Sequence, residues 1–240
     1  MRKILTTLTL LLALGCSTTP NIDLSAGVSH ELAQWRKATI NDVSYHLLFD
    51  LVDNWGWISI HYTLDKPQDV VLDFRNTELL RDISLGGENE SIIQECILSD
   101  EHIVIPASLT RSGEQSVTIH FDIDNQSLNR NPEFLYTLLV PDRARTLFPA
   151  FDQPDMKASY ELNLIIPQEW EAVSNTPTTV DSWATETYEY YTGNVLPADR
   201  KVVSFLPTEP LSTYLFSFVA GKLSKRTYDD GRHTFSAYYR

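Results

Sequence analysis

Short runs of β-branched and aromatic residues, separated by turn signals, follow one another from residue 43 to the end of this chain. Such runs between glycine, proline and aspartate clusters are typical of β-strands. Val117, Ile119 and Phe121 fall on one face of a strand while Thr118 and His120 fall on the other, as in a half-buried antiparallel strand. We expect strands over residues 43–51, 57–63, 70–74, 91–98, 116–122, 160–166, 187–191, 201–205, 214–221 and 234–239.

This pattern predicts an all-β fold of antiparallel sheets, either stacked as a sandwich or shaped like a saddle. One short helix is expected before the first strand, over residues 29–38. Ser29 is suited to cap this helix, Glu31 lies in its first turn, and Arg36 and Lys37 lie near its end. Neither a repeat nor a low-complexity segment interrupts the pattern.

The N-terminus has the composition of a bacterial export signal rather than of a folded domain. A positive start is followed by an apolar run to Leu14 and by small residues before Cys16. The run is too short for the roughly 20 residues that a transmembrane helix needs. We interpret residues 1–15 as a lipoprotein signal peptide, Cys16 as the lipidated N-terminus and residues 16–28 as a lipidated tether, in preference to an ordinary signal with an incidental cysteine.

Ser17, rather than an aspartate, follows the cysteine. By the bacterial sorting pattern, this favours an outer-membrane anchor facing the periplasm of a Gram-negative bacterium, so the membrane is a partner through the lipid. The formal net charge of −13 argues against nucleic acid as a partner and suits the solubility of an exported protein. With Cys16 lipidated, Cys96 has no disulfide partner, and we expect a buried, unreactive thiol there.

One short motif resembles a zinc site without completing it. His30 and Glu31 begin the pattern H-E-x-x-H, in which two histidines on one helix face bind zinc and the glutamate acts as a base, but Gln34 takes the place of the second histidine. An amide is a poor zinc ligand, and a strand, rather than a second helix with a third ligand, is expected by residue 43. We expect no metal, no cofactor and no catalytic residue in this chain, and a helix that caps the sandwich.

The stretch PDRARTLFPAFDQPDMKA, over residues 141–158, has the composition of a structural corner. Its prolines fix φ, and its phenylalanines bury large apolar areas. Asp152 is suited to accept backbone hydrogen bonds and to hold the loop. Arg145 and Lys157 are both candidates for an ion pair with Asp152, and the sequence leaves open which of them forms it.

The same stretch resembles the signature P-x-x-A-R-x-x-F-P-x-F-D-x-P-x-x-K-A in the N-terminal domain of zinc aminopeptidases of the aminopeptidase N family. Two further blocks, within residues 160–177 and 210–221, are similar to the family and follow in its order. The resemblance implies that residues 29–240 form the β domain that opens these enzymes. The signature residues that carry it are Arg145, Phe148, Pro149, Phe151, Asp152, Pro154 and Lys157.

The resemblance also implies what this domain lends to the active site. Just before the corner, the family has the pattern Q-x-E-P, whose glutamate helps to hold the α-amino group of the substrate. The matching positions here are Leu138, Leu139, Val140 and Pro141. Leu138 and Val140 cannot bind an ammonium group, so the family's usual substrate anchor is not expected. From its residues alone, the segment 136–140 is expected to be an ordinary buried strand.

In the complete family, zinc is bound by a thermolysin-like catalytic domain, which the resemblance places after Arg240. We therefore hypothesise that the chain is the N-terminal structural and substrate-gating domain of an exported zinc aminopeptidase-like protein. It would be inactive alone, as a gene fragment or beside a separately encoded catalytic domain. The alternative is a free-standing, lipid-anchored β-sandwich lipoprotein that binds a peptide or a protein partner. An exposed apolar patch would be the domain interface in the first case and the binding face in the second.

Overall fold

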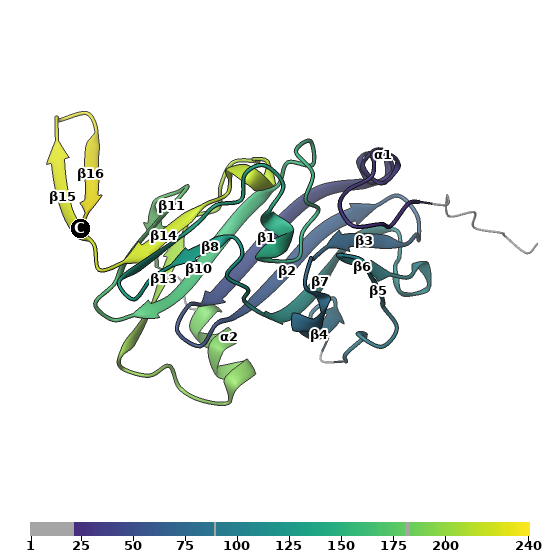
Figure 1. Cartoon of the computed structure of the whole chain (residues 1–240), viewed down its shortest axis with the longest axis horizontal. Coiled ribbons are helices and arrows are strands. Elements are labelled where there is room, and N and C mark those ends of the chain that lie inside the picture. Colours follow the sequence, from purple (N-terminus) through teal and green to yellow (C-terminus); the bar gives the residue numbers. More distant parts are fainter. Residues whose placement is uncertain (1–21, 89, 181–182) are drawn as a thin grey trace, which may run out of the picture.

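The computed structural model describes residues 22–88, 90–180 and 183–240, and the strands among them form four sheets (Figure 1). The all-β prediction is confirmed, since the described residues hold only two α-helices, α1 (His30–Thr39) and α2 (Trp183–Thr192). Neither helix is long and apolar enough to cross a membrane. The expected signal peptide and Cys16 lie outside the described residues.

The largest sheet has seven strands in the order β12-β13-β10-β1-β2-β7-β4 (Figure 1). Close packing on its inner face requires a glycine at position 56, because a Cβ there would lie 2.4 Å from the ring of Phe121. The strands are β12 (Thr178–Thr179), β13 (Arg200–Phe205), β10 (Ser159–Pro167), β1 (Ile40–Asp50), β2 (Trp55–Leu64), β7 (Gly113–Asp122) and β4 (Leu80–Leu85).

Two smaller sheets cover the inner face of the large sheet and enclose the main core with it. The ring of Phe49, on β1, lies 5.5 Å from that of Phe218 and 6.1 Å from that of Phe148, which joins the layers. One small sheet has the order β11-β14-β9-β8, with β11 (Glu171–Ser174), β14 (Phe218–Gly221), β9 (Phe134–Thr137) and β8 (Leu128–Arg130). The other has the order β3-β6-β5, with β3 (Val70–Asp73), β6 (His102–Ile105) and β5 (Ile97–Ser99).

The outer face of the large sheet is partly covered by α2 (Figure 1). Leu48 of β1, Trp55 of β2 and Ile165 of β10 form a second, smaller core with Ala184 and Tyr188 of the helix. The two helical residues are four apart and therefore lie on one helix face. The large sheet is thus buried on its inner face and only in part on its outer face.

Three expected strands are wrong in whole or in part. Residues 187–191 were expected to be a strand, but they are the C-terminal half of α2, because a run rich in tyrosine fits a half-buried helix face as well as a strand. Residues 91–98 are mostly turn, with only the end of the run in β5. The run 214–221 begins in a 3₁₀ turn, Thr213–Leu215, before β14.

Cys96 is half-buried in the turn before β5, less enclosed than expected. Burial raises the pKa of its thiol to about 11, and the neighbouring Glu95 adds to the shift. The thiol therefore stays protonated near neutral pH, as an unreactive cysteine does.

One central strand pair is parallel, an exception among the antiparallel sheets that the sequence predicts. β1 pairs with β10 in parallel, from Ser44 opposite Ser159 to Asp50 opposite Ile165. Parallel neighbours need a long crossover, and here all the strands from β2 to β9 lie between the two in sequence. No local pattern records the direction of a partner so far away in the chain, so the sequence could not show this pairing.

The N-terminal helix packs as a cap against the β3-β6-β5 sheet (Figure 1). Ser29 caps α1 as predicted, since its Oγ accepts the backbone N–H of Leu32 at 3.1 Å. Ahead of the helix, Ile22 and Leu24 pack against the small apolar cluster around Leu32. Part of the expected tether, from residue 22 to 28, is therefore packed on the body of the domain.

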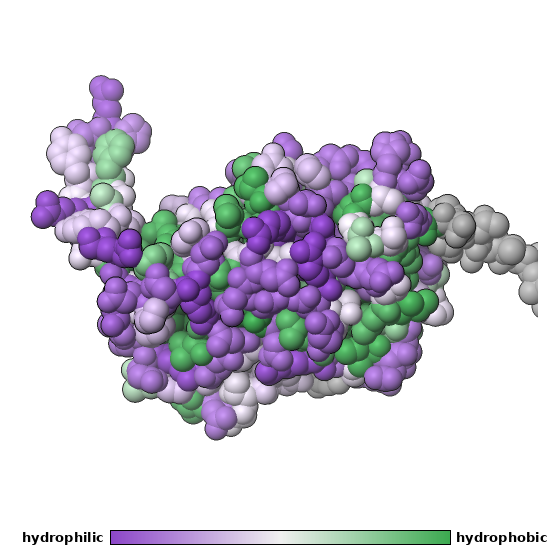
Figure 2. Space-filling model, in the orientation of Figure 1, coloured by the Kyte–Doolittle hydropathy of each residue, from purple (hydrophilic) through white to green (hydrophobic). Residues whose placement is uncertain are grey.

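The last two strands, β15 (Ser224–Asp229) and β16 (Thr234–Tyr239), form a separate hairpin that projects from the body (Figure 1). Its side chains are almost all exposed, including Tyr228 and Phe235. On the face shown in Figure 2, apolar surface is divided into small patches among hydrophilic side chains.

Candidate functional site

A row of three large side chains, Tyr136, Leu138 and Val140, points outward from β9 and the segment that follows it. Their exposed fractions are 42%, 45% and 52%, whereas the alternate residues Thr137 and Leu139 are buried. This alternation is typical of a strand with one buried face. The expectation of an ordinary buried strand is therefore wrong for the two positions that correspond to the family's substrate anchor. We refer to Tyr136, Leu138 and Val140 as the outward row.

Backbone hydrogen bonds fix the direction of the outward row. The N–H of Leu138 donates to the carbonyl of Ser127 at 2.9 Å, and the N–H of Arg143 donates to the carbonyl of Leu139 at 2.9 Å. The Thr137 hydroxyl accepts the N–H of Phe218 at 3.0 Å, which ties the row to β14. The row is therefore held at both ends, and its exposure does not come from a loose loop.

The corner that follows the row is held together by Asp152. One carboxylate oxygen accepts the backbone N–H of Arg145 at 3.0 Å, and the other accepts the hydroxyl of Thr213 at 2.9 Å. Phe148 and Phe151 have no exposed surface and belong to the main core. The corner is thus a buried, hydrogen-bonded structure of the kind that its sequence predicts.

The geometry shows which cation pairs with Asp152. The Arg145 guanidinium lies 3.5 Å from the Asp152 carboxylate, and its Nε donates to Glu101 at 2.9 Å. Burial lowers the pKa of Arg145, but its partners, Glu101 first among them, outweigh burial and raise it overall. Lys157 is exposed and forms no ion pair with a described residue. Of the other signature residues, Pro149 is buried and Pro154 is exposed.

Behind the corner, Asp73 forms a fully buried hub that the sequence analysis did not find. Its two carboxylate oxygens accept hydrogen bonds from the Arg36 guanidinium at 2.8 and 2.6 Å, and one also accepts the backbone N–H of Asp152 at 2.8 Å. His102 Nδ1 lies 2.9 Å from the other oxygen. Asp73 therefore connects α1, β6 and the corner.

The charges of this hub support one another. Burial alone disfavours the ionised form of Asp73, but Arg36 and His102 outweigh it and hold the pKa of the carboxyl below its usual range. Burial likewise opposes the charge on His102, but the hydrogen bond to Asp73 outweighs it and raises the pKa of the imidazole. Asp73 and Arg36 therefore form a buried ion pair, and the carboxylate of Asp73 favours the protonated form of the nearby His102 imidazole.

The incomplete zinc motif lies beside the corner. His30 lines a cavity of about 410 Å³ together with Arg145, Asp152 and Gln153, while Glu31 and Gln34 are exposed on α1. Within the described part of the chain, no three histidine, cysteine, aspartate or glutamate side chains lie close enough together to hold a metal ion. The structure does not bring His30 and Glu31 together with a third ligand.

Comparison with known protein families identifies this architecture. The model of the peptidase M1 N-terminal domain matches residues 68–215, more than half of the chain. The chain belongs to the M1 peptidase family. The matched range contains both the outward row and the corner, so both are part of the M1 N-terminal domain.

Curated M1 relatives align with most of this chain. Glutamyl aminopeptidase from Rattus norvegicus is 36% identical over 234 residues, which cover 84% of this chain and 24% of that protein. Probable M1 family aminopeptidase 2 from Encephalitozoon cuniculi (strain GB-M1) is 31% identical over 184 residues, covering 70% and 20%. Aminopeptidase N from Acetobacter pasteurianus is 27% identical over 240 residues, covering 93% and 64%. This chain thus spans between 20% and 64% of the length of these relatives.

A solved structure shares the fold. The crystal structure of Legionella pneumophila aminopeptidase A in complex with aspartic acid matches 83% of this chain and 24% of its own, with a TM-score of 0.69 and 18% sequence identity. At that identity the likeness concerns the arrangement of the strands.

Proposed function

We propose that this M1 N-terminal domain acts beside a zinc-binding catalytic domain, as the wall of the cleft that receives the N-terminus of a peptide. The observation that carries the proposal is the outward row. The family resemblance assigns positions 138 and 140 to the substrate anchor, and Leu138 and Val140 project from the surface there with half of their area exposed.

The chemistry of the outward row decides what kind of contact it makes. Leucine and valine present no acceptor to an ammonium group, but fully burying such a side chain contributes about 1.5–3 kcal/mol, and burying the half of each that is still exposed contributes about half of that. In this proposal the row gates the cleft by packing against the catalytic domain or an apolar peptide side chain, and it does not form an ion pair with the α-amino group. The zinc and the reacting groups belong to the catalytic domain.

The activity of the chain alone tests this division of roles. The purified chain is expected to contain no stoichiometric zinc and to hydrolyse none of a panel of aminoacyl nitroanilides. Addition of a thermolysin-like M1 catalytic segment is expected to give a complex in sedimentation velocity and to give turnover. The double variant Leu138→Asp/Val140→Asp is expected to weaken that complex or raise KM at least about tenfold, since two apolar contacts are lost.

A matched control uses Val195, which is 76% exposed in the loop after α2, far along the chain from the row. Combined with Val180→Asp at a fully exposed position, Val195→Asp adds the same two charges as the row variant and is expected to leave the complex and KM within about twofold. Zinc-dependent turnover by the chain alone would refute inactivity. An equal loss of complex affinity, or an equal rise in KM, in the row variant and the Val180/Val195 variant would refute the gating role.

The proposal places this domain outside the cytoplasm, held to the outer membrane by a lipid on Cys16. The support is the signal-like N-terminus with a cysteine directly after small residues. In a Gram-negative host, metabolic labelling with a radioactive fatty acid is expected to mark the chain, and Cys16→Ser is expected to remove the label and release the protein from membranes. Unlabelled protein that fractionates with the soluble periplasmic contents would contradict the anchor.

A further inference from the structure

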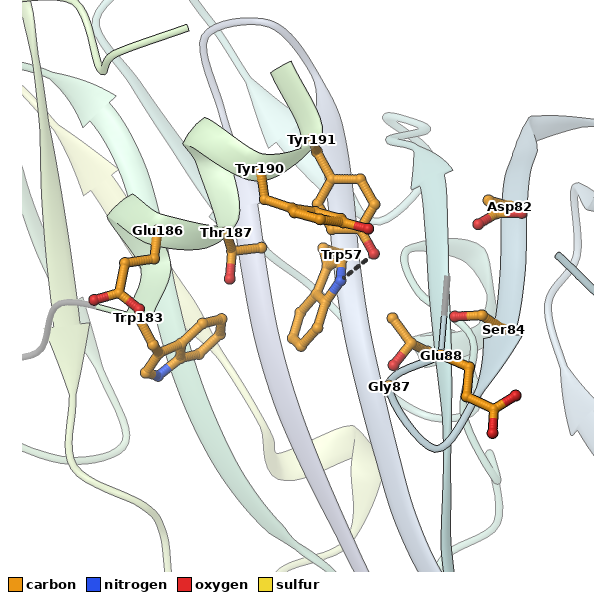
Figure 3. A pocket seen from close by; sticks show the side chains of 11 residues that line it. Trp57, Asp82, Ser84, Gly87, Glu88, Trp183, Glu186, Thr187, Tyr190 and Tyr191 are labelled. Carbon is orange, nitrogen blue, oxygen red and sulfur yellow. Dashed lines mark hydrogen bonds between the residues drawn. The ribbon is translucent and has the colours of Figure 1, made fainter. Parts of the chain in front are cut away.

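A cavity of about 440 Å³ lies on the outer face of the large sheet, between α2 and the turn after β4 (Figure 3). Its volume falls in the range of about 300–1,000 Å³ that is common for small-molecule sites. It is separated from the outward row by the large sheet and the core, because α2 packs on one face of that sheet and β9 lies beyond the other. We refer to it as the outer-face cavity.

Aromatic side chains from two elements form one wall of the outer-face cavity (Figure 3). Trp57 of β2 and Trp183 of α2 have ring centroids 5.4 Å apart, and Tyr190 and Tyr191 continue the wall along the helix. The Trp57 indole N–H donates to the Tyr191 hydroxyl at 2.8 Å, and that of Trp183 donates to Glu161 at 2.7 Å. Both indole donors are thus occupied, and the rings are held in place.

Three carboxylates line the same cavity. Asp82 and Glu88 lie on the side of β4, and Glu186 lies on α2 (Figure 3). None of the three forms an ion pair with a described residue, and no lysine, arginine or histidine is found among the residues that line the cavity. The three carboxylates therefore give the cavity a negative potential.

Two buried hydroxyl groups add unused hydrogen-bonding capacity. Ser84 and Thr118 face each other on neighbouring strands β4 and β7, line the cavity, and are only 5% and 8% exposed. Neither side chain hydrogen-bonds to a described residue. Their oxygens remain accessible through the cavity and are therefore available to hydrogen-bond a ligand or water there.

The inventory of donors and acceptors selects the ligand. Carboxylates only accept hydrogen bonds, the hydroxyls that line the cavity both donate and accept, and both indole N–H groups are already used. A neutral ligand such as a sugar leaves the three carboxylates without a counter-charge, whereas an ammonium or guanidinium group supplies one, brings only donors and is attracted to aromatic faces. We propose that the outer-face cavity binds an organic cation, namely an ammonium or guanidinium group on a short apolar stem.

The group can come from a free amine or from a lysine or arginine side chain of a peptide, and two probes separate these sources. Agmatine represents the free amine, and a blocked Gly-Arg-Gly peptide represents the side chain, with Gly-citrulline-Gly as its neutral counterpart. Titration into the purified chain, followed by calorimetry and tryptophan fluorescence, is expected to show one-to-one binding of a cationic probe with Kd below about 1 mM. Binding of agmatine alone assigns a free amine, and binding of the arginine peptide assigns a side chain.

Matched variants test whether the cavity itself is the site. Glu186→Gln and Asp82→Asn are each expected to weaken binding about fivefold to tenfold, because each removes one charged acceptor from a partly screened site. Glu189→Gln is the control, since Glu189 is exposed on the same helix but does not line the cavity. It is expected to leave Kd within about twofold.

Three outcomes would overturn the proposal. The first is that neither cationic probe binds, and the second is that the citrulline peptide binds as tightly as the arginine peptide. The third is an equal loss of binding affinity in the Glu189 control, which would mean that the net charge of the whole chain attracts the cationic probe. The proposal concerns a different face from the outward row, so it stands or falls independently of the proposed function.

Discussion

Asp73→Asn is expected to lower the free energy of unfolding by about 3–5 kcal/mol, which is the usual cost of breaking a buried ion pair by removing one partner. The asparagine leaves Arg36, which has no exposed surface, as an uncompensated buried charge. It also replaces by an amide N–H₂ one of the two oxygens, of which one faces His102 Nδ1 and the other accepts the backbone N–H of Asp152. Urea unfolding followed by tryptophan fluorescence measures the loss.

Asp122→Asn is the matched control, because Asp122 pairs with Arg81 at the surface, where both side chains are well exposed. Exposed pairs contribute about 0–1 kcal/mol, so this variant is expected to stay within that range. Arg36→Met/Asp73→Asn removes both charges and is expected to recover part of the loss. An Asp73→Asn variant no less stable than Asp122→Asn would show that the hub does not stabilise the fold.

The stability supplied by the hub also depends on pH. The pKa of Asp73 is lowered in the folded protein, so its contribution is present above the unfolded value of about 3.8 and is lost as pH falls through the folded pKa. The pKa of His102 is raised, so its contribution is full below about 6.5 and is lost as pH rises through the folded pKa. The difference between wild type and Asp73→Asn is therefore expected to be largest between about pH 4 and 6.5.

The sequence predicts the parts of this fold that depend on local chemistry. Ser29 caps α1 because a short hydroxyl side chain before a helix accepts an early N–H, and that requirement is visible within four residues. The local sequence also places Arg36 near the end of the helix. It cannot show that Arg36 is fully buried against Asp73, which follows 37 residues later in the chain. An aspartate at the end of an apolar run was the available signal, and it is equally typical of a turn.

The candidate site, too, could be predicted only where it depends on local sequence. The signature predicts a buried corner, because its prolines and phenylalanines restrict the chain wherever they occur. It does not show that the preceding Leu138 and Val140 face outward, since leucine and valine suit either face of a strand and the packing of the rest of the domain decides between the two faces. The outer-face cavity was hidden for another reason. One face of α2 carries Trp183, Thr187 and Tyr191, which follow one another at intervals of four residues. When residues 187–191 are interpreted as a strand, this helical spacing is not recognised.

Asp152→Ala is expected to destabilise the domain by about 3–5 kcal/mol, a loss similar to that of the hub variant. Alanine leaves the buried N–H of Arg145 and the hydroxyl of Thr213, which is 1% exposed, without acceptors. Each unsatisfied buried donor costs about 1–3 kcal/mol, and the loss of a charged neighbour for Arg145 adds to this. Asp152→Asn is expected to cost less, because one amide oxygen still accepts from Arg145 while the Thr213 hydroxyl rotates to accept from the amide nitrogen.

A second aspartate variant in the same loop shows whether the loss of stability comes from the hydrogen bonds of Asp152 or from the removal of a negative charge. Asp155→Ala removes an exposed aspartate three residues further along the same loop and is expected to change stability by less than about 1 kcal/mol. Hydrogen exchange gives a local measure, since the Arg145 amide is expected to exchange much faster in Asp152→Ala than in Asp155→Ala. Because the corner directly follows the outward row, its loosening is also expected to speed exchange at Arg143, whose N–H bonds to Leu139. Unchanged exchange at both amides would mean that Asp152 does not hold the corner and that the aromatic core alone fixes the direction of the row.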